Sequence, residues 1–227
     1  PLAWELSLTE AGNIVSLGYM AAGKRFNAKE KDLFGNPFAQ FLKVNTSLRK
    51  TWALGQKSQL VGHVAAGVLW AYGNSSRGPY SEQFYVGGAN SIRAFTIRSI
   101  GPGKYVAPSS TYSYLDQTGD IKLEMNLEYR FNLFGSLYGA LFLDAGNIWL
   151  MEKDENRPDA EFRFDTFWRQ LALGTGLGLR YDLDFFVLRL DLGVALHVPY
   201  DTTKSGFYNI PKFSDGLGLH FAIGYPF

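Results

Sequence analysis

The chain contains no cysteine, no long apolar run and almost no net charge. Its 227 residues carry 22 Lys and Arg against 21 Asp and Glu, a formal net charge of +1. Without cysteine there is neither a disulfide scaffold nor a thiolate metal site. A charge so close to zero gives no sign of a nucleic-acid partner. No segment approaches the roughly 20 consecutive apolar residues of a membrane-spanning helix.

Apolar and aromatic residues are nevertheless abundant. Hydrophobic residues make up 46% of the chain and aromatic residues 16%, yet the mean hydropathy is only −0.09. Strict alternation of apolar and polar residues conceals hydrophobicity in this way, because each window averages both kinds. Together with 25 glycines, this composition is typical of an all-β protein.

The clearest strand is predicted at 121–133, where the residues divide by parity. The odd positions are Ile121, Leu123, Met125, Leu127, Tyr129, Phe131 and Leu133, and the even positions are Lys122, Glu124, Asn126, Glu128, Arg130 and Asn132. Successive side chains of a strand point to opposite faces, so one face is apolar and the other polar. A soluble sandwich would bury the apolar face, whereas a membrane barrel would turn it to lipid. This strand alone is compatible with both.

The same alternation recurs, clearly or with more noise, in eight further segments. They lie at 2–8, 15–21, 42–48, 60–72, 137–145, 170–181, 186–196 and 216–227. Short predicted connections at 9–13, 51–59, 132–136 and 181–184 alternate with long ones at 26–39, 73–119, 148–168 and 199–215. Outer-membrane barrels segregate short and long connections to opposite sides of the membrane. The nine segments therefore favour a transmembrane antiparallel β-barrel over a sandwich.

The long connection contains the segment Gly87-Gly88-Ala89-Asn90-Ser91-Ile92-Arg93-Ala94-Phe95. It resembles the sixth extracellular loop of the BamA/TamA superfamily (the bacterial surface antigen family), whose motif is Gly-Gly…(Val/Ile)-Arg-Gly-(Phe/Tyr). The matching residues are Gly87, Gly88, Ile92, Arg93, Ala94 and Phe95, with Ala94 in place of the family's usual glycine. The resemblance implies that the loop folds into the lumen. There Arg93 would meet Glu128 and Asp144, both at lumen-facing positions of predicted strands.

The resemblance covers essentially the whole chain. It implies that residues 1–227 form the C-terminal portion of one outer-membrane barrel domain, about nine strands of sixteen, with an inserted loop at 73–119. The upstream strands and the periplasmic domains usual in the family are absent from this sequence. Because the chain begins at Pro1 without methionine or signal peptide, we expect a processed product or a fragment.

The implied function is non-enzymatic. It is the assembly and insertion of β-barrels, or protein translocation, in the outer membrane of Gram-negative bacteria, with no cofactor and no metal. The implied partners are outer-membrane lipid, client β-barrel or secreted proteins, and periplasmic or lipoprotein accessory subunits. The last strand would border a lateral gate. The residues assigned to the gate and the C-terminal signal are Gly216, Gly218, Gly224, Tyr225 and Phe227.

Two alternatives stay open. A passive channel or porin would explain the alternation, with Arg93 a solvated loop charge, and a two-partner secretion transporter would share the loop motif. An outer-membrane enzyme would need a catalytic constellation, and no Gly-x-Ser-x-Gly elbow occurs. His63, His197 and His220 lie on different predicted strands without metal-ligand spacing, so no metal site is expected.

Overall fold

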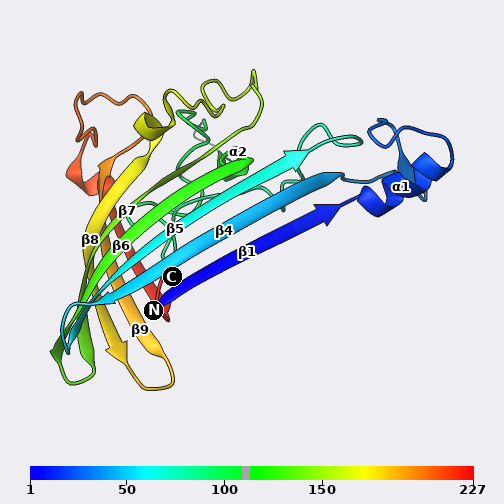
Figure 1. The fold of residues 1–227 in the computed structure, drawn as a ribbon. Helices are drawn as coiled ribbons and strands as arrows, with labels where there is room; N and C mark the ends of the chain where they lie inside the picture. The colour runs from blue at the N-terminus through cyan, green and yellow to red at the C-terminus, as the bar shows by residue number, and fades with distance from the viewer. Residues whose placement is uncertain (109–112) are drawn as a thin grey trace.

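The computed structural model describes residues 1–108 and 113–227 and is dominated by one antiparallel sheet of eight strands. Their order in the sheet is β1 (Leu2–Ala11), β4 (Phe41–Ala53), β5 (Ser58–Ala71), β6 (Ile121–Phe134), β7 (Leu137–Trp149), β8 (Ala172–Asp182), β9 (Val187–His197) and β10 (Leu217–Ile223). The sheet curves like a trough, with the connection between β5 and β6 running along its inside (Figure 1). Residues 109–112 of the predicted loop at 73–119 lie outside the described residues.

The smaller elements lie in the connections. They are α1 (Asn13–Ala21), the hairpin of β2 (Asp32–Leu33) and β3 (Asn36–Pro37), α2 (Ser113–Asp116), and two 3₁₀ turns at Phe167–Gln170 and Phe213–Gly216. Among the described residues, no helix has the length and apolarity needed to cross a membrane.

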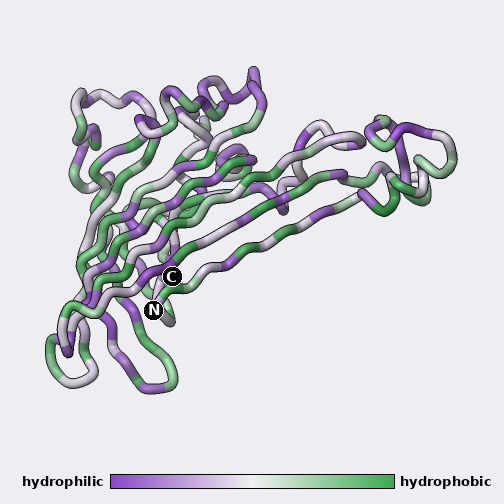
Figure 2. The backbone as a smooth tube through the Cα atoms, viewed as in Figure 1, coloured by the Kyte–Doolittle hydropathy of each residue, from purple (hydrophilic) through white to green (hydrophobic). Residues whose placement is uncertain are grey.

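The strand register places like residues beside like and so builds two contrasting faces. Leu127 lies opposite Leu143, whereas Asn126 lies opposite Asp144. Figure 2 shows the resulting alternation of hydrophobic and hydrophilic residues along the strands. The leucine face is open, with Leu127 43% and Leu143 42% exposed, while Glu128 on the polar face is fully buried. A soluble sandwich would show the reverse, so the sheet has the inside-out arrangement of a membrane barrel wall.

The prediction of a strand at 15–21 was wrong, because these residues belong to α1. Gly12, at φ 77°, turns the chain out of β1, and the exposed apolar residues Ile14, Leu17 and Met20 recur at a helical spacing of three. Ser16, in contrast, is buried and accepts a hydrogen bond from Lys31 Nζ at 2.7 Å. The predicted count of nine strands is therefore corrected to eight.

The predicted short connection at 9–13 was also wrong, because residues 9–11 are the end of β1 and residues 12–13 begin a long connection. The long connections at 12–40, 72–120, 150–171 and 198–216 now all leave one end of the sheet, and the short turns at 54–57, 135–136 and 183–186 lie at the other. The predicted segregation of connections is thus confirmed. Within the described residues, β1 pairs only with β4 and β10 only with β9, so this sheet does not close on itself.

We expect a lipid-face charge to destabilise the wall in a depth-dependent way. Leu192 lies midway along β9 between Leu177 and Leu219, so Leu192→Arg should lower the free energy of unfolding by about 2–4 kcal/mol. Leu188→Arg, close to the short-turn end of the same strand, should cost only about 0–1 kcal/mol. Denaturant unfolding in lipid bilayers measures both. Equal costs for the two variants would contradict a bilayer around this face.

Candidate functional site

The candidate site is the loop of residues 86–98, which is closed by its own backbone. Gly88 N donates to Phe95 O at 2.7 Å, and Arg98 N donates to Val86 O at 3.0 Å. Gly87 and Gly88 have φ values of 97° and 91°, a region that other residues adopt only with strain. The two glycines of the motif are therefore required by the turn that brings the loop back on itself.

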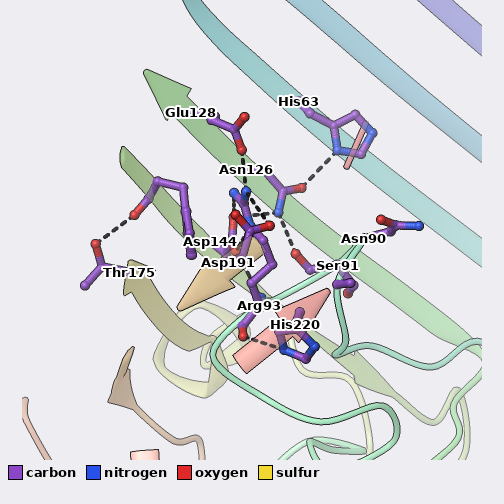
Figure 3. A network of polar contacts seen from close by, with 12 residues as sticks. His63, Asn90, Ser91, Arg93, Asn126, Glu128, Asp144, Thr175, Asp191 and His220 are labelled. Atoms are coloured by element: carbon purple, nitrogen blue, oxygen red, sulfur yellow. Dashed lines mark hydrogen bonds and ion pairs between the residues drawn. The ribbon is translucent and has the colours of Figure 1, made fainter. Parts of the chain in front are cut away.

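Arg93 projects from this loop into the polar face of the sheet and is fully buried (Figure 3). Its Nε and one terminal nitrogen donate to the two carboxylate oxygens of Asp144, each at 2.9 Å, and its backbone N donates to Asp144 at 3.0 Å. The other terminal nitrogen pairs with Glu128. Asp144 and Glu128 are the two residues that the resemblance had implied as partners of Arg93. Bidentate, charge-assisted hydrogen bonds of this kind fix both position and orientation.

The charge of Arg93 is held by these two carboxylates. Burial alone would lower the pKa of the guanidinium, but the hydrogen bonds and charges of Asp144 and Glu128 raise it above its ordinary value. The guanidinium is also packed against the Phe142 ring, with Cζ 3.6 Å from the ring centroid. Arg93 therefore stays cationic inside the barrel wall.

A wider charge network surrounds this pair. Glu128 also accepts from Arg130 Nε at 2.6 Å and from Arg180 at 3.1 Å. Arg180 in turn donates to Asp191 at 2.5 Å, and Arg189 lies 3.4 Å from the same carboxylate. From the sequence, Arg130 was placed on the polar face, but neither it nor Arg180, Arg189 and Asp191 was assigned to the site. Their inward parity could be read from the sequence. That they meet in one network depends on the register of the four strands β6 to β9.

Loop contacts extend from β6 to β10. Ser91 Oγ donates to Glu124 at 2.7 Å on β6, and Arg189 on β9 donates to Ala89 O at 2.9 Å. His220 on β10 lies with Nε2 2.8 Å from the carbonyl oxygen of Arg93, to which it donates (Figure 3). The loop thus joins the middle of the sheet to its last strand. In the sequence, His220 was considered only together with His63 and His197, as a residue without metal-ligand spacing.

Inward glycines provide the space for the loop. A Cβ on Gly193 would come within 2.7 Å of Ala94 Cα, and a Cβ on Gly218 within 2.9 Å of the Arg93 carbonyl oxygen. A Cβ on Gly174 would collide with the Ala94 methyl group. Ala94 itself does not have a positive φ, so alanine is accepted where the family motif has glycine. Gly176 and Gly178 instead leave room for the neighbouring side chains Phe142 and Arg180.

The apolar motif residues anchor the loop. Ile92 is fully buried and Phe95 is 9% exposed, and both belong to one core cluster with Val86, Ile148 and Ala172. This cluster lies between the loop and the inner face of the sheet, toward the end from which the long connections leave. Hydrophobic contacts and ion pairs therefore hold the same short segment.

The last strand was predicted to run to the end of the chain, and this prediction was wrong. Gly216 lies in a 3₁₀ turn, β10 ends at Ile223, and Gly224 adopts φ 85°. Tyr225 and Phe227 share the odd parity of Leu219, which faces outward, but they point inward. The Arg130 guanidinium lies 4.2 Å from the Tyr225 ring, and Phe227 stacks on His63 of β5 at 5.1 Å between ring centroids. The positive φ of Gly224 interrupts the alternation on which the parity assignment depended.

These features define a class of protein: a transmembrane β-barrel wall with a loop inserted on its inner face. The chain belongs to the Omp85 superfamily, since the model of the Omp85 superfamily domain matches residues 20–227. The outer membrane protein assembly factor BamA of Neisseria meningitidis is 32% identical over 107 residues, which make up 45% of this chain and 12% of that protein.

Two solved structures are also similar. BamA from Haemophilus ducreyi lacking POTRA domains 1–3 has a TM-score of 0.56 at 15% identity, covering 81% of this chain and 35% of that one. CdiB from Acinetobacter baumannii has a TM-score of 0.46 at 17% identity, covering 82% and 27%. The chain thus spans about a third or less of the length of these relatives.

Loss of the Arg93 charge should release the loop from the wall. Arg93→Ala leaves Asp144 and Glu128 without their main cation, at a cost of several kcal/mol. Because the chain has no cysteine, Ile92→Cys would provide a single buried thiol. We expect thiol labelling to be fast with Arg93→Ala and intermediate with Arg93→Lys, which keeps the charge but loses the bidentate geometry. Arg163→Ala, at an exposed arginine, is the control. Slow labelling in every variant would contradict anchoring by Arg93.

Proposed function

We propose that this chain forms the C-terminal part of the barrel of an outer-membrane factor that inserts β-barrel proteins into the membrane or moves proteins across it. The proposal rests on family membership and on one observation, the Arg93 loop that ties β6 and β7 to β9 and β10. Its partners would be outer-membrane lipid, client β-barrel or secreted proteins, and periplasmic or lipoprotein accessory subunits. No enzymatic step is part of the proposal.

The loop favours this function over a passive channel. A porin needs an open aqueous lumen, whereas here the loop places a buried arginine and an apolar cluster along the inner wall. Charges buried at this depth are expensive unless they are paired, and the wall supplies three carboxylates for them. The cost of burying these charges is understandable if the loop controls the conformation of the barrel wall.

The last strand has properties that suit a lateral gate. β10 spans seven residues, whereas the other strands of the sheet span 10 to 14. Its inward positions include Gly218, which packs weakly, and its end is turned away by Gly224. In a complete barrel such a short strand would form few hydrogen bonds with the first strand. An open edge there would offer unpaired N–H and C=O groups to a client strand.

Arg93→Ala in the full-length protein should fail to support growth when the native protein is depleted, and outer-membrane porins should be lost. The reason is that the loop would no longer hold β10 relative to β6 and β7. Arg163→Ala, in an outward connection, should support normal growth. Growth and porin content are measured together with the level of folded variant protein. Full complementation by Arg93→Ala would refute a role of the loop in assembly.

Gly224→Val should slow client insertion without unfolding the wall. Valine disfavours a φ of 85°, so the chain end would tend to extend along the sheet and lengthen the pairing of the last strand. Gly206→Val is a matched control, because Gly206 also has a positive φ, of 103°, and both glycines have open space around a Cβ. Insertion rates into proteoliposomes provide the measurement. Equal rates for the two variants would argue against a hinge at Gly224.

A further inference from the structure

Lys50 lies at an outward, lipid-facing position of β4. The even positions of β4 carry the outward side chains, because odd-numbered Lys43 pairs with Glu82 of the inner loop at 3.2 Å. Lys50 is the only basic residue at an outward position of the eight described strands, and its neighbours in the register are Leu2 and Gly62. No ion pair of Lys50 is present among the described residues. A charged side chain facing lipid is costly and needs a counter-charge.

A groove begins beside this lysine. It holds about 460 Å³ and is lined by apolar side chains of the outward face, chiefly Leu48, Trp52, Val64, Met125 and Leu127. Gly62 forms its floor next to Lys50, and a Cβ there would lie 3.1 Å from the Trp52 ring. The missing side chain of Gly62 therefore opens the groove where the ammonium group can overhang it.

The depth of Lys50 fits the headgroup region of one leaflet. The residue lies three positions before Ala53, where β4 ends at the short-turn side. At about 3.3 Å per residue and a tilt of about 45°, this is about 7 Å below the strand end. A lysine side chain can cover that distance and place its ammonium among phosphates while its stem stays in the groove. From Lys50 the groove leads through Leu48, Val64 and Met125 toward the middle of the bilayer.

We propose that this groove binds one phospholipid of the leaflet on the short-turn side. The Lys50 ammonium pairs with the lipid phosphate, and one acyl chain lies along Leu48, Val64 and Met125. Since no acidic side chain pairs with Lys50 among the described residues, the site favours an anionic phospholipid over a zwitterionic one. From the proposed function this inference takes only the position of the strands in the membrane, not any role in assembly.

The test is native mass spectrometry of the full-length protein from detergent micelles containing dimyristoylphosphatidylglycerol. Lys50→Gln removes the charge and keeps most of the stem, and Gly62→Leu fills the groove. Arg49→Gln is the matched control, since it removes a positive charge one residue earlier on the inner face of the same strand. We expect wild type and Arg49→Gln to retain one tightly bound phosphatidylglycerol, and Lys50→Gln to bind it about fivefold more weakly.

The neutral lipid dimyristoylglycerol separates the two parts of the site. Lys50→Gln should leave its retention unchanged, whereas Gly62→Leu should abolish retention of both lipids. Equal phosphatidylglycerol retention by wild type and Lys50→Gln would overturn the proposal, as would equal losses in Lys50→Gln and Arg49→Gln. Because purified protein is measured, a negative result here would leave the growth phenotype of Arg93→Ala unaffected, and the two proposals fail separately.

Discussion

The ion pairs of Arg93 with Asp144 and Glu128 are the interaction on which the interior depends. All three side chains are fully buried, so each would be strongly unfavourable without the others. Glu128 pairs with Arg93, Arg130 and Arg180. Asp191 likewise pairs with Arg93, Arg180 and Arg189. Removal of one member therefore leaves a buried, unbalanced charge beside the remaining members of the network. Such a network adds little to net stability but specifies one position for the loop.

The wall is shaped to receive that network. Gly174, Gly193 and Gly218 lie on three successive strands and let the backbone of Arg93 and Ala94 approach the sheet more closely than any side chain would allow. Backbone entropy and lost packing weaken the same strands. The loop compensates with ion pairs and with the burial of Ile92 and Phe95. The stability of β8 to β10 is thus coupled to the presence of the loop.

This coupling gives the proposed gate a physical basis. The last strand is short, contacts the loop through His220, and ends at a glycine that turns the chain toward β5 and β6. A movement of the loop would therefore be transmitted to β10 by a hydrogen bond and by close backbone contact. The outward face must be compatible with lipid, and Lys50 is the one basic residue at an outward position of the eight described strands.

The sequence by itself determined the two faces of the wall. Side chains alternate along any strand, so the parity of 121–133 identified Glu128 as inward and Leu127 as outward before any pairing was known. The loop motif likewise indicated Arg93 and its two carboxylates. Local pattern failed where the backbone leaves the strand conformation, at α1 and at Tyr225 and Phe227 beyond Gly224. Only the tertiary structure brought Arg180, Arg189, Asp191 and His220 to the loop, because their contacts depend on the register and curvature of strands far apart in the chain.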